Sequence, residues 1–196
     1  MRIAKATLNR NWLWSSGLAI LAFAVLAMLD YRLKARTGVG TLDMMSFAGA
    51  VQYRAAFFVW AALPDAATAG FNLGFSFVLM PLYAASFFYS GIIAAEAFAP
   101  RPNLTRRIIL MAALAPLVGA VGDAVGAVLQ ISMLVGGPDD TIATFAAAAG
   151  RVKMVALFIG LALFLGAVMA RFQARRGSPQ AANAKAETRV GFDEKP

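Results

Sequence analysis

The stretch IILMAALAPLVGAVGDAVGAVLQISMLV at residues 108–135 carries a single charged side chain, Asp123. About 20 apolar residues in a helix cross the hydrocarbon core of a bilayer, so this stretch is predicted to be a membrane span. Small residues recur around Asp123 at spacings of three and four, which lets a neighbouring helix approach closely. We expect helix packing at Ala115, Gly119, Gly122 and Gly126. Pro116 lacks a backbone N–H and is predicted to kink the helix.

The composition of the whole chain agrees with a membrane protein. Of the 196 residues, 60% are hydrophobic and 14% are charged, against about 45–50% and 25% in soluble domains. The absence of His and Cys excludes disulfides, thiolate nucleophiles, Ser-His-Asp triads and His-ligated zinc or haem. We expect no metal site, no cofactor and no catalytic residue.

Three further apolar runs complete a predicted all-α, polytopic bundle of four transmembrane helices. The expected spans are residues 12–30, 71–98, 108–135 and 152–171. Residues 42–63 are apolar too, but Arg54 near their centre would be costly at mid-bilayer, so we expect an interfacial helix in the first loop, capped by Thr41. Residues 140–149 are expected to form a short helix before the last span. The membrane bundle then covers residues 1–176, and 177–196 form a polar cytoplasmic tail.

Basic residues cluster at the ends of these spans, which accounts for the net charge of +8 without nucleic acid binding. The clusters lie before the first span, at 101–107 and after the last span, so both termini are predicted to be cytoplasmic. Three residues oppose this orientation because it would place them outside: Arg32, Lys34 and Arg36.

Polar residues within the spans are the candidate functional groups. Asp123 lies near mid-span with Gln130 on the same face, and its carboxylate must face the protein interior. The second span has a polar stripe, which an apolar environment turns inward, and we expect this stripe to face the third span. Its members are Asn72, Ser76, Tyr83, Ser86 and Ser90. Three interpretations stay open: hydrogen bonds that join helices, a proton or cation relay at Asp123, or a ligand cavity lined by Tyr83, Ser86 and Asp123.

Ion pairs are expected where acidic and basic residues approach the interface. Glu96 is expected to pair with a nearby arginine such as Arg106. Lys153 is expected to extend toward the membrane surface. If the last helix begins deeper, Lys153 or Arg54 becomes the candidate partner of Asp123.

Three short motifs resemble a family of small bacterial four-helix integral membrane proteins of unknown function. They are FSFVLMPLY at 75–83, GDAVGA at 122–127 and RVK at 151–153, in which Pro81, Tyr83, Asp123 and Lys153 match. The chain departs from the family where Ser76 replaces an acidic residue and Gly126-Ala127 replace a Glu-Asn pair. The resemblance implies the fold and a bacterial inner membrane location, and the departures argue against catalysis.

The sequence therefore favours a non-enzymatic accessory or assembly subunit whose partners are lipid and other membrane subunits or a second copy of the chain. One alternative is a small transporter or a proton- or cation-coupled channel subunit that uses Asp123. Another is a membrane enzyme or binding protein for a lipophilic substrate, held in a cavity between the second and third spans.

Overall fold

The computed structural model describes residues 5–47, 49–62, 65–99 and 103–176. The helices are α1 (Lys5–Thr37), η1 (Leu42–Ser46), α2 (Ala50–Ala62), α3 (Ala66–Phe98), α4 (Leu104–Ala112), α5 (Ala115–Gly136) and α6 (Asp140–Arg176). With α4 and α5 counted as one span, four helices are long and apolar enough to cross a membrane. The predicted all-α membrane bundle is therefore confirmed. The predicted tail at 177–196 lies outside the described residues.

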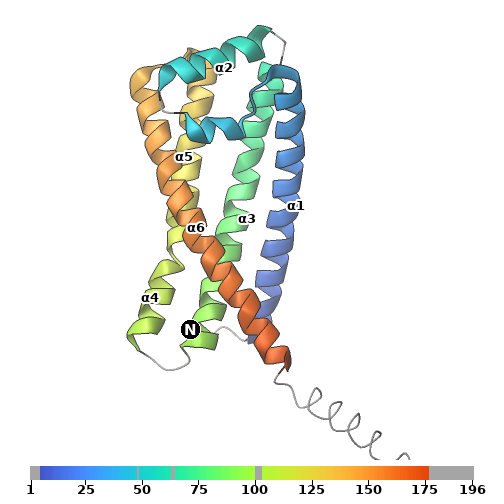
Figure 1. Ribbon diagram of the computed structural model, residues 1–196, viewed down its shortest axis with the longest axis vertical. Helices are drawn as coiled ribbons and strands as arrows, with labels where there is room; N and C mark the ends of the chain where they lie inside the picture. The colour runs from blue at the N-terminus through green and yellow to red at the C-terminus, as the bar shows by residue number, and fades with distance from the viewer. Residues whose placement is uncertain (1–4, 48, 63–64, 100–102, 177–196) are drawn as a thin grey trace, which may run out of the picture.

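Helix α3 is the centre of the bundle, because α1, α5 and α6 all pack against it. Helix α5 also packs along α6, which crosses the bundle diagonally (Figure 1). The start of α1 and the end of α6 lie at one end of the bundle, and α2 lies across the other (Figure 1). We call the first the terminal end and the second the α2 end.

The third span is broken before its proline. Helix α4 ends at Ala112 and α5 begins at Ala115, so Pro116 lies in the first turn of α5. In place of the kink predicted at Pro116, the helix is broken between Ala112 and Ala115. A proline in a first turn removes no helical hydrogen bond, because that N–H would have no partner within the helix.

The last span begins earlier than predicted. The expected short helix at 140–149 is the first part of α6, which continues without interruption to Arg176. Asp139 starts this helix, since its carboxylate accepts the backbone N–H groups of Thr141 and Ile142 at 2.8 and 3.1 Å. Gly137, with φ of 93°, ends α5 in a backbone conformation that favours glycine.

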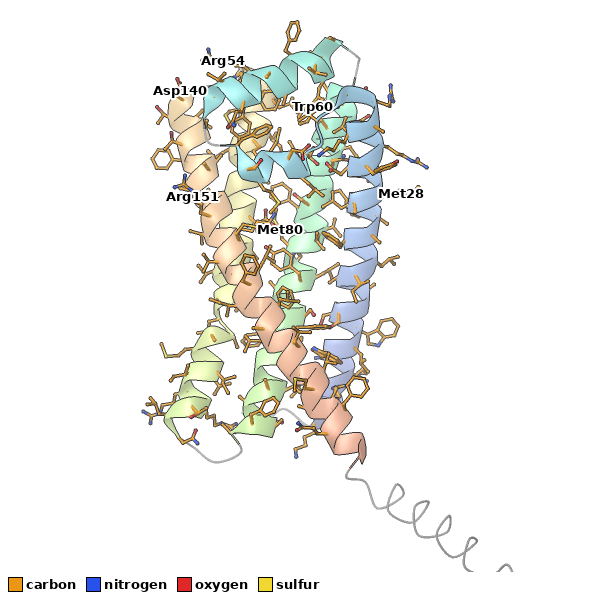
Figure 2. All side chains as sticks on the ribbon, viewed as in Figure 1. Met28, Arg54, Trp60, Met80, Asp140 and Arg151 are labelled. Carbon is orange, nitrogen blue, oxygen red and sulfur yellow. The ribbon has the colours of Figure 1, made fainter. Side chains whose placement is uncertain are left out.

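The segment predicted as one interfacial helix forms two pieces, η1 and α2. Helix α2 buries Tyr53, Phe57 and Trp60 against the ends of the spans, and Trp60 donates its indole N–H to the Val39 carbonyl at 3.0 Å. Arg54 is exposed on the opposite side (Figure 2). An apolar face with a charged outer side is what a helix at the interface requires.

A buried carboxylate holds η1 against α1. Asp30 is buried near the end of α1, and its Oδ1 accepts the Thr41 hydroxyl at 2.7 Å and the Leu42 N–H at 3.0 Å. The sequence suggested that Thr41 caps the following helix. Its hydroxyl bonds to Asp30 instead. Gly40 lies so close to this carboxylate that a Cβ would overlap it.

The spans bury small residues and expose large ones. Their buried positions are mainly alanine, glycine and serine, whereas leucine, valine and phenylalanine cover the outside. Large apolar side chains on the outside are favourable in lipid, and small ones inside let the helix backbones approach. Burial therefore has the pattern expected for a bundle surrounded by lipid.

Candidate functional site

The central feature of the bundle is an ion pair between Asp123 of α5 and Lys153 of α6. The Lys153 Nζ lies 2.7 Å from Asp123 Oδ1, and the two side chains are 17% and 12% exposed. Tyr83 of α3 donates its hydroxyl to Asp123 Oδ2 at 3.2 Å. Three spans thus converge on one carboxylate, each of whose oxygens accepts a hydrogen bond.

Glycines of α5 allow this convergence. Cβ atoms built at Gly122 and Gly126 would lie 3.4 Å from the Ala149 carbonyl oxygen and 3.6 Å from the Ala149 Cβ of α6, and a Cβ at Gly119 would overlap that of Ala156. Close packing brings Lys153 within reach of Asp123. Ala115, the fourth predicted packing residue, is the first residue of α5.

Lys153 is therefore not extended toward the surface. Because α6 begins at Asp140, Lys153 lies several turns inside the helix and faces the bundle. Of the two cations considered as partners of Asp123, Lys153 is paired and Arg54 is exposed on α2.

The polar stripe of α3 faces two neighbours. Tyr83 faces α5, but Ser86 and Ser90 face α1: the Ser86 and Ser16 hydroxyls are 2.7 Å apart, and the Trp12 indole N–H donates to the Ser90 hydroxyl at 2.7 Å. Ser76 donates to the Leu73 carbonyl of its own helix. The stripe was expected to face the third span, and the difference arises because α3 lies between α1 and α5.

A cavity of about 600 Å³ lies between these helices and contains the ion pair at one side. Its walls are mostly aliphatic and aromatic side chains of α1, α3 and α6, and its polar groups include the Asp123–Lys153 pair, Tyr83, Ser86 and Ser16. Ile20, Phe23 and Leu161 line it and are also exposed on the outer surface. The cavity therefore opens sideways, between α1 and α6, toward the region that lipid occupies.

Helices α1 and α6 meet below this opening and separate toward the α2 end (Figure 1). At the closed end, the Trp12 and Phe164 rings lie 5.6 Å apart and the Arg171 guanidinium lies 4.2 Å from the centre of the Trp12 ring. At the other end, Leu42 and Met45 of η1 line the cavity. The sequence predicted a cavity between the second and third spans, but this cavity lies among α1, α3 and α6, and Asp123 is the residue of α5 that lines it.

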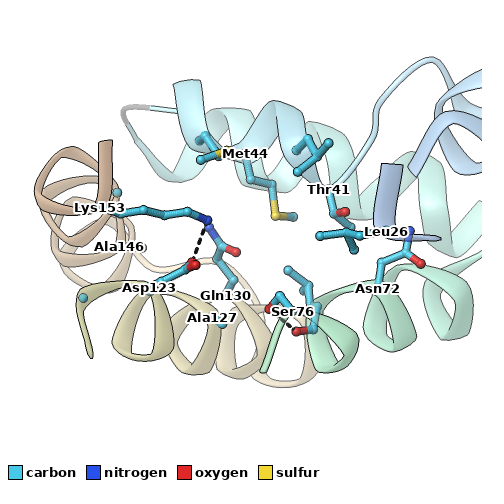
Figure 3. A pocket seen from close by; sticks show the side chains of 16 residues that line it. Leu26, Thr41, Met44, Asn72, Ser76, Asp123, Ala127, Gln130, Ala146 and Lys153 are labelled. Atoms are coloured by element: carbon cyan, nitrogen blue, oxygen red, sulfur yellow. Dashed lines mark hydrogen bonds and ion pairs between the residues drawn. The ribbon is translucent and has the colours of Figure 1, made fainter. Parts of the chain in front are cut away.

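A smaller cavity of about 60 Å³ adjoins the ion pair on the side of η1 (Figure 3). We call it the polar chamber, because polar groups from four segments line it. They are Thr41, Asn72, Ser76, Asp123, Gln130 and Lys153. Gln130, predicted to share a face with Asp123, lines this chamber and not the larger cavity.

The predicted ion pair of Glu96 with Arg106 is absent from the described part of the chain. Arg106 donates to the Ala99 carbonyl at 3.2 Å, and Glu96 lies with Lys5 and Arg171 around a hollow at the terminal end. Arg106 thus bonds to the residue that follows α3 from the first turn of α4, which Asn103 caps by accepting the Arg106 backbone N–H.

Sequence reasoning missed two groups and undervalued a third. Ser16 of α1 and Asp30 were not considered as functional, although both are polar residues in or at the end of an apolar run. Asn72 was assigned to the α3 stripe, but its isolation in the polar chamber depends on η1 and α5, which the stripe does not predict.

Among the described residues, no three carboxylates gather where they could hold a metal ion. No protein-family model, curated protein or solved structure matches the chain.

Proposed function

We propose that the protein binds a lipophilic molecule, which enters from the bilayer between α1 and α6. The single observation that carries the proposal is the side-opening cavity of about 600 Å³, with apolar walls and the Asp123–Lys153 pair at one side. Binding cavities for small molecules are typically about 300–1,000 Å³, mostly apolar, with a few polar groups that fix orientation.

The chemistry of the polar groups favours binding over catalysis. Asp123 accepts hydrogen bonds from Lys153 and Tyr83, so its carboxylate is already engaged. A nucleophile is activated by an adjacent general base that is free to accept its proton, and the chain has no His or Cys to supply either group. The ion pair instead offers a fixed dipole that can orient a ligand.

A cavity-filling variant tests the proposal. Leu161 and Leu165 lie one turn apart on α6 and are 48% and 55% exposed, but Leu161 lines the cavity and Leu165 does not. Leu161→Trp should obstruct the cavity, whereas Leu165→Trp adds the same bulk to the lipid-facing surface. Each protein is purified in dodecyl maltoside, and its bound lipophiles are extracted and quantified by mass spectrometry.

We expect wild type and Leu165→Trp to retain a lipophile in near-stoichiometric amount and Leu161→Trp to lose most of it. Equal retention by the two variants, or no retained molecule in wild type, would refute the proposal. The assembly-subunit function that the sequence favours stays a prediction, and the same purification tests it through any partner protein retained in fixed proportion.

We also propose that both termini face the cytoplasm of a bacterial inner membrane. Support comes from Arg106 and Arg107 at the terminal end, and from the ion pairs Lys34–Asp43 and Arg36–Asp65, which neutralise two of the basic residues at the α2 end. Since the chain has no Cys, Thr105→Cys and Thr141→Cys each give a unique label site at opposite ends. An impermeant maleimide applied to intact cells should label Thr141→Cys alone; labelling of Thr105→Cys alone reverses the orientation.

A further inference from the structure

The polar chamber and the large cavity adjoin each other at the ion pair. Both are lined by Leu42 and Met45 of η1, and both include Asp123 and Lys153. The chamber, at about 60 Å³, exceeds the roughly 10–15 Å³ that one water needs. A ligand in the large cavity could therefore place a small polar group in the chamber.

Asn72 is the group in this chamber that lacks a partner. Its side chain is 1% exposed, and neither its amide nitrogen nor its amide oxygen has a hydrogen-bond partner in the described structure. A buried amide without hydrogen bonds is unfavourable, and natural proteins seldom retain one without a functional or solvent partner. Asn72 lines the chamber (Figure 3), so that partner would occupy this space.

The charges around the two cavities restrict what this partner can be. Among the described residues that line either cavity, Asp123 and Lys153 are the charged ones, and they neutralise each other at 2.7 Å. A charged head group would be desolvated there without a spare counter-charge. The Asn72 side chain offers an amide NH₂ group as donor and an amide oxygen as acceptor. Together they suit a hydroxyl or carbonyl group.

We propose that the polar chamber binds the uncharged, hydrogen-bonding head of a neutral lipid and that Asn72 recognises it. The inference rests on the proposed function, because the apolar part of the same lipid would fill the cavity between α1 and α6. Asn72 donates through its amide nitrogen and accepts through its amide oxygen, and the ion pair lies where the chamber meets the large cavity.

Three probes with the same oleyl chain length and different heads test this inference: monooleoylglycerol (neutral), oleate (anionic) and oleylamine (cationic). Binding to the full chain in detergent is measured by native mass spectrometry. We expect monooleoylglycerol to bind at least about tenfold more tightly than either charged probe. Tenfold corresponds to about 1.4 kcal/mol.

Asn72→Leu keeps the branched shape and the same number of heavy atoms, and it removes both polar atoms. It should weaken monooleoylglycerol binding about tenfold and raise the unfolding temperature of the ligand-free protein, because an unpartnered amide is removed from the interior. Ser90→Ala is the matched control: Ser90 is a buried polar residue of α3 that lines neither cavity, so this variant should bind the probe as wild type does.

The outcomes separate the inference from the function on which it rests. Equal binding of the three probes, preference for a charged probe, or unchanged binding by Asn72→Leu would overturn the inference. If the probes bind to wild type in any of these ways but no longer bind to Leu161→Trp, the proposed function stands. Failure of every probe to bind would overturn both. The comparison of head groups uses wild-type protein, so it decides the question even if Asn72→Leu fails to fold.

Discussion

Replacing Lys153 by methionine removes the ammonium group from the Asp123 carboxylate and keeps a long side chain in place. The ion pair is 2.7 Å long and its members are 17% and 12% exposed, so water screens it weakly. At an effective dielectric constant of about 20, charges at that distance attract by about 6 kcal/mol, much of which offsets the desolvation of both groups. The net change in the free energy of unfolding must therefore be worked out separately for each variant.

Lys153→Met leaves Asp123 buried with the Tyr83 hydrogen bond alone. Loss of one member of a buried pair typically costs about 3–5 kcal/mol, and a lone carboxylate in a span about 2.5–3.5 kcal/mol. We expect the free energy of unfolding to fall by about 3 kcal/mol. Adding Asp123→Asn removes the remaining charge, so the double variant should be no less stable than Lys153→Met.

The assay is unfolding by sodium dodecyl sulfate in mixed micelles, followed by tryptophan fluorescence. Lys34→Met is the matched control, because the Lys34–Asp43 pair has the same 2.7 Å length but Lys34 is 52% exposed. An exposed pair contributes little, so this variant should unfold almost as wild type does. Equal effects of Lys153→Met and Lys34→Met, or a double variant as destabilised as the sum of its singles, would refute the reasoning.

Three further predictions concern packing and the attachment of η1. A Cβ at Gly119 overlaps Ala156, whereas one at Gly74 meets nothing within 4 Å, so Gly119→Ala should destabilise by about 1–3 kcal/mol in the same unfolding assay and Gly74→Ala should not. Gly40→Ala should displace the Asp30 carboxylate and speed hydrogen exchange at the Leu42 amide, while Gly49→Ala, which meets nothing within 4 Å, should leave that rate unchanged. Lys34 lowers the pKa of Asp43 below its ordinary 3.8, so the stability from this pair is present above about pH 4 and is lost as the pH falls through the lowered value. The unfolding temperatures of wild type and Asp43→Asn should therefore differ at pH 7 and converge once the pH lies below the lowered pKa of Asp43, and a gap that persists there would contradict this account.

The four spans are predictable from sequence because hydropathy and length decide them. The points at which individual helices begin, end or break are not predictable in this way. Residues 140–149 are rich in alanine, which suits a helix before the membrane as well as one continuous with the span, so Lys153 was placed too near the surface. The separation of η1 from α2 depends on Asp30, which bonds residues eleven and twelve positions away.

The site was predictable in part. Asp123 stands out because it is a lone carboxylate in an apolar run, and Tyr83 because it belongs to a helical stripe. Pairing with Lys153 and the isolation of Asn72 depend on how α6 and η1 lie against α3 and α5. Those are contacts between segments distant in sequence, which periodicity does not encode.

The length of α6 links the cavity to the thickness of the surrounding membrane. At about 1.5 Å per residue, its 37 residues extend about 55 Å, well beyond a hydrocarbon layer of about 30 Å. Such a helix adapts to a thinner bilayer by tilting further from the membrane normal and to a thicker one by tilting less. Because α6 forms one side of the opening and α1 the other, a change in tilt alters the width through which a molecule passes. Lipid composition would then regulate access to the cavity without any change in the residues that line it.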